Sequence, residues 1–322
     1  MAKLAVGIIT AGGDAPGMNA AIRACVRSLL AEETRVIGIK RGYKGLIEKD
    51  FETLTSRSVS GIINLGGTIL KTARCEEIRT EEGLEKAARN LNELSLDYLI
   101  VIGGDGTFRA AKEISRKSGV HCIGIPASID NDIDGTEETI GFDTAVNTAL
   151  EAIDKIRDTA ISHERFFIVE VMGRGSGFLA ITVGLASGSE FILIPEKPPN
   201  VDKLIEKYKM MKSLGKTSMI AVLAEGAING LTLVNMLKKK IDAEVRFSSI
   251  GYIQRGGMPT VRSRILANLF SAKAVEMIFE DKKDLMVGII DNKISENELT
   301  GKKRVIGERE IYMLNLAEKL AI

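Results

Sequence analysis

Along the chain, short continuous apolar runs alternate with longer stretches in which apolar and polar positions form an amphipathic pattern. The runs at residues 4–10 and 97–102 are short, apolar and followed by glycine, which is typical of buried strands. Between them, residues 18–30 repeat apolar side chains at steps of three and four, which predicts an amphipathic helix. Buried strands that alternate with helices predict parallel sheets with helices on both faces, the α/β class.

The same alternation continues along the chain as far as residue 226. In parallel sheets, ligands bind beyond the carboxyl ends of the strands, and the glycine-rich and acidic turns of this chain follow its predicted strands. We expect further strands at residues 36–39, 121–125, 166–171, 191–194 and 218–223. We expect further helices at residues 59–63, 84–94, 108–118, 144–159 and 201–212.

The composition excludes several classes of protein. The 322 residues are 45% hydrophobic and 27% charged, as in ordinary globular proteins. Lys and Arg number 44 against 43 Asp and Glu, and this balance argues against a nucleic-acid partner. The longest uncharged apolar stretch, residues 175–189, is too short and too rich in glycine to span a membrane. Three scattered cysteines, and no leader-type cleavage pattern after the first apolar run, predict a cytoplasmic location.

The glycine-rich turn at residues 103–107 (GGDGT) is the first candidate site. Its backbone N–H groups and the start of the next helix would attract a phosphate, and Asp105 could hold Mg²⁺ beside it. An ordinary strand-to-helix turn explains the same residues equally well. A second Gly-Gly-Asp at residues 12–14 favours the phosphate interpretation.

The acidic segment at residues 128–132 (SIDND) is the second candidate site. If its backbone is extended, Asp130 and Asp132 point the same way, so that one could act as a base while the other orients an arginine or a metal-bound water. Carboxylates this close raise each other's pKa unless a cation lies nearby. A surface turn is the alternative, because Asn and Asp are common in turns.

Several arginines lie at or near glycine loops or strand ends. The rigid guanidinium fork matches phosphate oxygens, so this placement suggests an anionic substrate. For any single arginine, a solvated surface position is the alternative. The residues are Arg74, Arg165, Arg174, Arg246 and Arg255.

Eight ordered motifs make the chain resemble the bacterial-type 6-phosphofructokinases over essentially its whole length. The first four are T-x-GGDAPGMNAAIR at residues 10–23, GGT-x4-AR ending at Arg74, IGGDGT at residues 102–107, and IDNDI-x-GT-x2-TIGFDTA-x-NT at residues 129–148. The others are AIDKIRDTA-x-SHER at residues 152–165, EVMGR at residues 170–174, AEG at residues 224–226 and G-x-IQRGG at residues 251–257.

The resemblance implies ATP-dependent phosphorylation of the 1-hydroxyl of fructose 6-phosphate, with Mg²⁺ as cofactor. It implies two similar parallel-sheet α/β domains with the active site in the cleft between them. Residues 1–141 with 254–304 would bind the nucleotide, and residues 142–253 with 305–322 would bind the sugar phosphate. It also implies a homo-oligomer, usually a tetramer.

The resemblance also assigns roles to individual residues. Asp130 would be the catalytic base, supported by Ser128, Asp132, Arg174 and Arg74, and Asp105 would hold the metal. The nucleotide would contact Gly13, Arg74, Cys75, Gly104, Asp105, Gly106 and Thr107. The sugar phosphate would contact Ser128, Ile129, Asp130, Met172, Gly173, Arg174, Glu225, Tyr252 and Arg255, with Arg165 and Arg246 reaching over from a neighbouring subunit.

A regulatory site for ADP or phosphoenolpyruvate is also implied by the resemblance, at a subunit interface. Without the resemblance, the cations on the first helix would be interpreted as an exposed helix face. The position where the family has a further arginine is occupied by Ser56. The implied residues are Arg23, Arg27, Arg157, Glu190 and Lys216.

Three departures from the family pattern keep other functions open. Tyr252 replaces the usual histidine of the sugar-phosphate site, Ala127 replaces a glycine, and Ser128 replaces a threonine. Pyrophosphate-using relatives typically have Lys at position 127 and Asp at position 106, so ATP is the favoured donor. The alternatives are a kinase for a related ketose phosphate, pyrophosphate as the donor, or a non-catalytic sensor of nucleotides or sugar phosphates on the same fold.

Overall fold

The computed structural model describes residues 4–321 and divides into two compact units. The first unit holds the residues up to Thr144 together with Arg255–Arg304. The second holds Ala145–Gln254 together with the residues from Val305 on. Each unit is therefore assembled from segments that lie far apart in the sequence.

The first unit is built on an eight-stranded sheet within the described residues. Its strands are β1 (Ala5–Ala11), β2 (Arg35–Ile39), β3 (Phe51–Thr53), β4 (Tyr98–Gly103), β5 (His121–Ser128), β6 (Ile140–Gly141), β11 (Leu285–Ile290) and β12 (Lys293–Glu298). Their order is β12-β11-β5-β4-β1-β2-β3, with β6 paired to β5. All pairs are parallel except those made by β3 and β12, which run antiparallel at the two edges.

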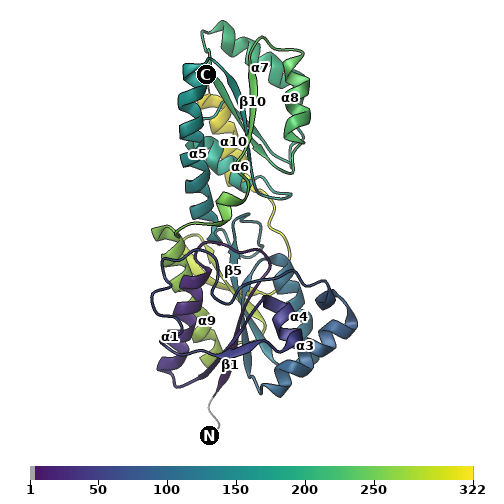
Figure 1. The fold of residues 1–322 in the computed structure, drawn as a ribbon, viewed down its shortest axis with the longest axis vertical. Coiled ribbons are helices and arrows are strands. Elements are labelled where there is room, and N and C mark those ends of the chain that lie inside the picture. The colour runs from purple at the N-terminus through teal and green to yellow at the C-terminus, as the bar shows by residue number, and fades with distance from the viewer. Residues whose placement is uncertain (1–3, 322) are drawn as a thin grey trace. The chain divides into compact units, whose positions relative to one another are not determined.

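Helices cover both faces of this sheet, and β1 and β4 are buried along their whole length as a result. Figure 1 shows α1 and α9 on one face, with α3 and α4 on the other. Side chains of α2, α3 and α4 share one apolar core with β1, β2 and β4. The helices are α1 (Met18–Ala31), α2 (Gly42–Glu48), α3 (Glu81–Glu93), α4 (Asp105–Ser118) and α9 (Val261–Phe279), and a short 3-10 turn η1 lies at Glu77–Arg79.

The second unit has a smaller, wholly parallel sheet. Its strands, in the order β10-β7-β9-β8, are β10 (Val245–Ser249), β7 (Phe166–Val171), β9 (Met219–Ala224) and β8 (Phe191–Leu193). Figure 1 shows α7 and α8 on one side of this sheet and α5, α6 and α10 on the other. These helices are α5 (Phe142–Ser162), α6 (Phe178–Ala186), α7 (Val201–Ser213), α8 (Gly230–Lys238) and α10 (Glu308–Leu320), and the 3-10 turn η2 lies at Gly251–Arg255.

The predicted α/β class with parallel sheets is confirmed, and so are most of the predicted elements. The predicted helix at residues 59–63 is wrong, because that segment is a series of turns. The helix predicted from residue 108 begins earlier, at Asp105. None of the helices within residues 4–321 combines the length and apolar character needed to cross a membrane.

Candidate active site

Three candidate turns of the first unit lie at one edge of its sheet. β5, β4 and β1 are neighbouring parallel strands, and their register pairs Ala11 with Gly103 and Gly103 with Pro126. The turns that follow these strands are therefore brought together. They are the Gly-Gly-Asp turn at residues 12–14, the GGDGT turn at residues 103–107 and the acidic loop at residues 128–132.

The glycines of the GGDGT turn differ in what surrounds them. A Cβ on Gly103 would lie 2.4 Å from the Ala11 carbonyl oxygen, so this position requires glycine to let β4 approach β1. A Cβ on Gly104 or Gly106 would meet no atom within 4 Å. The packing of the protein therefore does not require glycine at these two positions. Open space lies over the turn at the start of α4, where a phosphate could bind.

Asp105 lies in the first turn of α4 and is 7% exposed. Arg109, one helical turn later, donates a hydrogen bond of 2.7 Å to its Oδ2 atom. Within residues 4–321, no group of three or more Asp, Glu, His or Cys side chains is arranged as a metal site. Asp105 therefore offers a single carboxylate. This fits a Mg²⁺ ion that takes its other ligands from phosphate and water.

Thr107 has a structural contact, since its hydroxyl donates to the Ala11 carbonyl at 2.9 Å. Cys75 packs against the apolar core, and burial raises the pKa of its thiol. Arg74, beside it, is exposed. Of these three predicted nucleotide contacts, Arg74 is the one whose side chain is exposed, and it is a cation that could contact a phosphate.

Arg255 belongs to the first unit and lies on the Gly13 turn. Its Nη1 atom would be 2.6 Å from a Cβ built on Gly13, and it lies 3.8 Å from Oδ1 of Asp14. The guanidinium occupies the space that a side chain at position 13 would need. Any residue larger than glycine there would displace Arg255.

The acidic loop after β5 is buried rather than a surface turn, because Asp130 and Asp132 are each 3% exposed. The condition under which Asp130 and Asp132 would point the same way is not met, because Asn131 between them has a left-handed φ of 54° and not an extended backbone. The Ser128 hydroxyl accepts a hydrogen bond of 3.1 Å from the Asp130 N–H. Thr139 donates to the Ser128 carbonyl and to Oδ1 of Asn131, which fixes the loop from the side.

Asp132 is paired with a cation that the sequence did not point to. Lys303 donates a hydrogen bond of 2.8 Å to Oδ2 of Asp132, and the Arg304 N–H donates to the Asp132 carbonyl at 2.9 Å. The two basic residues follow β12 and stand 171 residues or more away in the chain. Lys303 and Arg304 lie in a polar segment between β12 and α10 and are not part of a recognisable sequence motif. Only the fold therefore reveals this contact.

A second set of predicted residues gathers at the carboxyl edge of the smaller sheet. The Arg174 N–H donates to Oε1 of Glu225 at 2.7 Å, which ties the loop after β7 to the loop after β9. Gly226 is required for this approach, because a Cβ there would lie 2.0 Å from the Arg174 carbonyl oxygen. Met172 donates its N–H to Oε1 of Gln254 at 3.4 Å.

Tyr252 lies in η2, which follows the neighbouring strand β10 and is joined to the β7 loop by the Gln254 contact. Tyr252 is 78% exposed. The carboxyl ends of β7, β9 and β10 therefore bring together Met172, Gly173, Arg174, Glu225 and Tyr252.

Arg165 and Arg246 lie at the opposite end of the same strands. Arg165 immediately precedes β7, and its Nε atom donates to Oε2 of Glu244 at 2.5 Å. Arg246 pairs with the same carboxylate, whose pKa is lowered mainly by the Arg165 contact. Within this chain, these two arginines are not brought to the loops that hold Arg174 and Tyr252.

Three of the candidate effector residues meet in the second unit. Glu190 is 3% exposed and accepts hydrogen bonds from Lys216 at 2.9 Å and from the Ile220 N–H at 2.6 Å. An Arg157 nitrogen lies 3.9 Å from the same carboxylate. Two of the candidate effector cations are thus already paired with Glu190. Arg23 and Arg27 lie on α1 in the first unit.

Comparison with known proteins agrees with these observations. The family described as Phosphofructokinase matches residues 5–278. The "ATP-dependent 6-phosphofructokinase" of Clostridioides difficile is 49% identical over 310 residues, which cover 95% of this chain and 97% of the relative. The chain belongs to the phosphofructokinase family. A phosphofructokinase named "ATP-dependent 6-phosphofructokinase 1", from Thermus thermophilus, is 47% identical over 322 residues and covers 98% and 99% of the two chains.

Solved phosphofructokinase structures share the fold. The Saccharomyces cerevisiae phosphofructokinase matches 99% of this chain at 32% identity and a TM-score of 0.84. The Pichia pastoris enzyme in its T-state matches all of it at 32% identity and 0.88. This chain spans only 48% and 37% of those two yeast chains. A pyrophosphate-dependent phosphofructokinase from Marinobacter aquaeolei, 21% identical with a TM-score of 0.83, supports the fold alone.

Proposed function

We propose that this chain transfers the γ-phosphoryl group of ATP to the 1-hydroxyl of fructose 6-phosphate, a step of glycolysis. The observation that carries the proposal is the buried acidic loop at residues 128–132, which follows β5 beside the open glycine turn that follows β4. The names of the bacterial relatives support the donor and the acceptor.

We assign ATP binding to the first unit. The phosphates lie over Gly104 and Gly106, with the N-terminus of α4 beneath them, and Gly13, Thr107 and Cys75 are the further nucleotide contacts that we assign. Arg74 is the exposed cation that contacts the nucleotide. Asp105 is the protein ligand of Mg²⁺, an ion that, when bound, neutralises charge on the phosphate oxygens.

Asp130 is the general base of this reaction. Its carboxylate takes the proton of the 1-hydroxyl while that oxygen forms a bond to the γ-phosphorus and the bond from phosphorus to the β-phosphate oxygen breaks, releasing ADP. Ser128 contacts the Asp130 backbone and the transferred group. Asp132, paired with Lys303, holds the loop, and Arg174 stabilises the charge on the phosphoryl group in transfer.

We assign sugar-phosphate contacts to Ile129 and Arg255 and to residues of the second unit. Met172, Gly173, Glu225 and Tyr252 supply contacts at the carboxyl edge of the smaller sheet. Arg165 and Arg246 serve a neighbouring subunit of a homotetramer, which agrees with their place at the far end of β7 and β10. A cytoplasmic location fits the three free thiols.

Regulation by ADP or phosphoenolpyruvate is assigned to Arg23 and Arg27 together with the cluster of Arg157, Glu190 and Lys216. The buried Glu190 holds two of these cations in place before an effector binds. Preformed geometry of this kind lowers the cost of binding an anion.

A screen of donors against acceptors tests the function. ATP and pyrophosphate are each combined with fructose 6-phosphate and with other ketose phosphates, and kcat/KM is measured for each pair. We expect the highest value for ATP with fructose 6-phosphate. A higher kcat/KM with pyrophosphate would contradict ATP as the donor, and a higher kcat/KM with another ketose phosphate would contradict fructose 6-phosphate as the acceptor. Tight binding of ATP and fructose 6-phosphate without turnover would favour the alternative of a non-catalytic sensor.

A further inference from the structure

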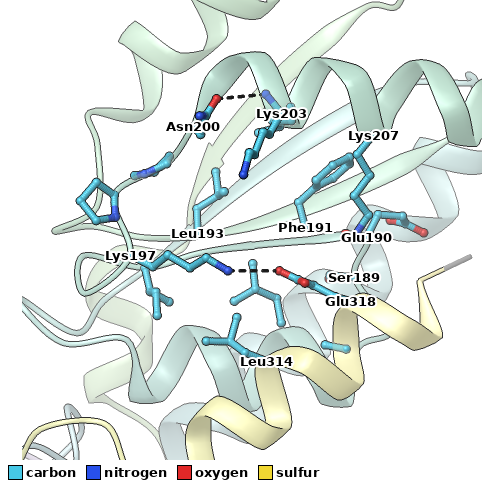
Figure 2. Close-up of a pocket in the computed structure, with 16 residues that line it drawn as sticks. Ser189, Glu190, Phe191, Leu193, Lys197, Asn200, Lys203, Lys207, Leu314 and Glu318 are labelled. Atoms are coloured by element: carbon cyan, nitrogen blue, oxygen red, sulfur yellow. Dashed lines mark hydrogen bonds and ion pairs between the residues drawn. The ribbon is translucent and has the colours of Figure 1, made fainter.

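A pocket that the proposed reaction does not use lies in the second unit, beside the edge strand β8. It is a partly open pocket lined by β8, the loop that follows this strand, α7 and α10, and its volume is about 220 Å³ (Figure 2). Its apolar lining includes Phe191, Leu193, Ile194, Leu204, Leu314 and Ala317. A dry aliphatic cavity of roughly 150 Å³ accommodates one benzene ring, so this pocket has room for one ring or one branched chain with a small polar group.

Lysines dominate the charged part of the lining. Lys197, Lys203 and Lys207 face the pocket together with Glu318 and Glu190. The carboxylate of Glu190 is already taken up by Lys216 and the Ile220 N–H. Three ammonium groups are therefore opposed by one available carboxylate, that of Glu318, and the pocket favours an anion.

The three lysines differ in how firmly they are held. Lys207 is half-buried, donates to the Glu190 carbonyl at 2.8 Å and lies 5.1 Å from the centre of the Phe191 ring. Burial is the main reason that its pKa is lowered. Lys197 has only a loose contact, 3.6 Å, with Oε1 of Glu318.

Lys203 is the cation best placed to bind a ligand. Figure 2 shows its side chain reaching from α7 toward Leu193, over the apolar lining. Its backbone N–H is capped by Asn200, but its ammonium has no hydrogen-bond or ion-pair partner among residues 4–321. An ammonium poised above an apolar surface matches a ligand that has a carboxylate at one end and a hydrocarbon body at the other.

We propose that this pocket binds a small monocarboxylate with an apolar body of about one ring, its carboxylate at Lys203 and Lys197 and its body against Leu193 and Leu314. A sugar phosphate or a nucleotide fits poorly, because an apolar lining would leave buried hydroxyl groups without hydrogen bonds. The pocket shares Glu190 with the candidate effector cluster, but the cations of the two sites differ. Lys207 donates to the Glu190 carbonyl, whereas Arg157 and Lys216 hold the Glu190 carboxylate.

Binding is tested on the intact protein with 4-fluorobenzoate as the probe, followed by ¹⁹F NMR. 4-Fluorobenzamide has the same shape without the charge, and acetate has the charge without the ring. We expect 4-fluorobenzoate to bind saturably and about tenfold more tightly than either. Equal affinity for the amide, or no saturable binding, would overturn the proposal. Displacement by fructose 6-phosphate or ADP would place the probe in another site and would also overturn it.

Two variants locate the probe. Lys203→Met keeps the apolar stem and removes the charge, and we expect it to weaken 4-fluorobenzoate binding roughly fivefold to tenfold while kcat stays unchanged. Lys209→Met removes an exposed lysine of the same helix outside the pocket and should have no effect on binding. Ala317→Leu fills part of the pocket, so it should weaken binding of 4-fluorobenzoate. The preference of the pocket for the benzoate over the benzamide should not change. Equal affinity in Lys203→Met and Lys209→Met would refute the assignment.

Discussion

The ion pair between Lys303 and Asp132 makes a clear prediction for a single side chain. Lys303→Met keeps the length of the side chain but leaves the buried Asp132 carboxylate without its 2.8 Å donor. Losing a partner of this kind costs on the order of 1–3 kcal/mol, and we expect kcat/KM to fall roughly tenfold.

The pH profile distinguishes this role from simple destabilisation. With Lys303 removed, the negative charge of Asp132 is no longer balanced, so the nearby base holds its proton more strongly and the acid limb of kcat/KM moves to higher pH. Lys303→Arg should restore both the rate and the profile. A Lys303→Met enzyme with an unchanged acid limb would show that the pair only supports the fold.

Asp130→Asn tests the assigned base. The amide preserves the shape of the buried loop and cannot accept the proton, so kcat should fall by about 10²–10⁴. Asp134→Asn is the matched control, because Asp134 is exposed in the same loop and should keep its activity. A loss of less than about tenfold in a folded Asp130→Asn protein would remove Asp130 from the role of base.

Among helices and strands, the start of α4 gives a prediction about the donor. Gly106 faces open space, so Gly106→Asp should fold with an unchanged melting temperature. Its carboxylate would lie where we place the ATP phosphates, and repulsion between like charges should nearly abolish turnover with ATP. Gly106→Asn, of similar size but neutral, should keep more activity. Equal kcat/KM for ATP in the aspartate and asparagine variants would show that the ATP phosphates do not bind beside Gly106.

The contact between α9 and β12 predicts how stability depends on pH. Glu296 lies between Lys273 at 2.9 Å and Lys282 at 3.2 Å, and its pKa is lowered, mainly by the Lys273 contact. A carboxyl group whose pKa is lowered in the folded state stabilises the protein at pH values above the ordinary pKa of the group, which is 4.5 for Glu. That stability is lost as the pH falls below this value.

Urea unfolding at pH 6 and pH 3.5 measures this term. Glu296→Gln should be less stable than the native protein by a few tenths to about 1 kcal/mol at pH 6, and the difference should shrink at pH 3.5. Glu32→Gln, at an exposed position, should not change the pH dependence. A constant difference at both pH values would mean that the charge of Glu296 does not contribute.

The apolar pattern predicted strands better than it predicted short helices. The strand expected at residues 166–171 matches β7 residue for residue, because five of its six side chains are apolar and most of them are buried. The helix expected at residues 59–63 failed although Val59 and Ile62 are indeed buried. Their spacing correctly indicated burial, but Gly61 has a φ of 72° and the segment turns instead.

For the whole molecule, the candidate effector site predicts a shift in sugar affinity. We expect millimolar ADP or phosphoenolpyruvate to move the fructose 6-phosphate saturation curve, with a coupling of roughly 1–3 kcal/mol. Arg23→Ala combined with Arg27→Ala should abolish the shift. Superimposable curves in the native protein would mean that the site is vestigial, and a shift that persists in the double variant would place the effector elsewhere.

The sequence located the main turns of the site because each lies within a few residues of a strand end. It could not locate Lys303, which reaches Asp132 only because β11 pairs with β5 and β12 pairs with β11. It also gave no sign that Arg165 and Arg246 share Glu244. Partners that the fold brings together from distant segments leave no local pattern to read.

The return of the chain to its first unit has a consequence for synthesis on the ribosome. β5 ends at Ser128, but β11, its partner on one edge, begins only at Leu285, after most of the second unit has been made. At usual translation rates, the growing chain waits on the order of ten seconds for that strand. Lys303 arrives later still, so a nascent chain cannot supply the counter-charge of the acidic loop until residues 145–254 and both strands β11 and β12 have been translated.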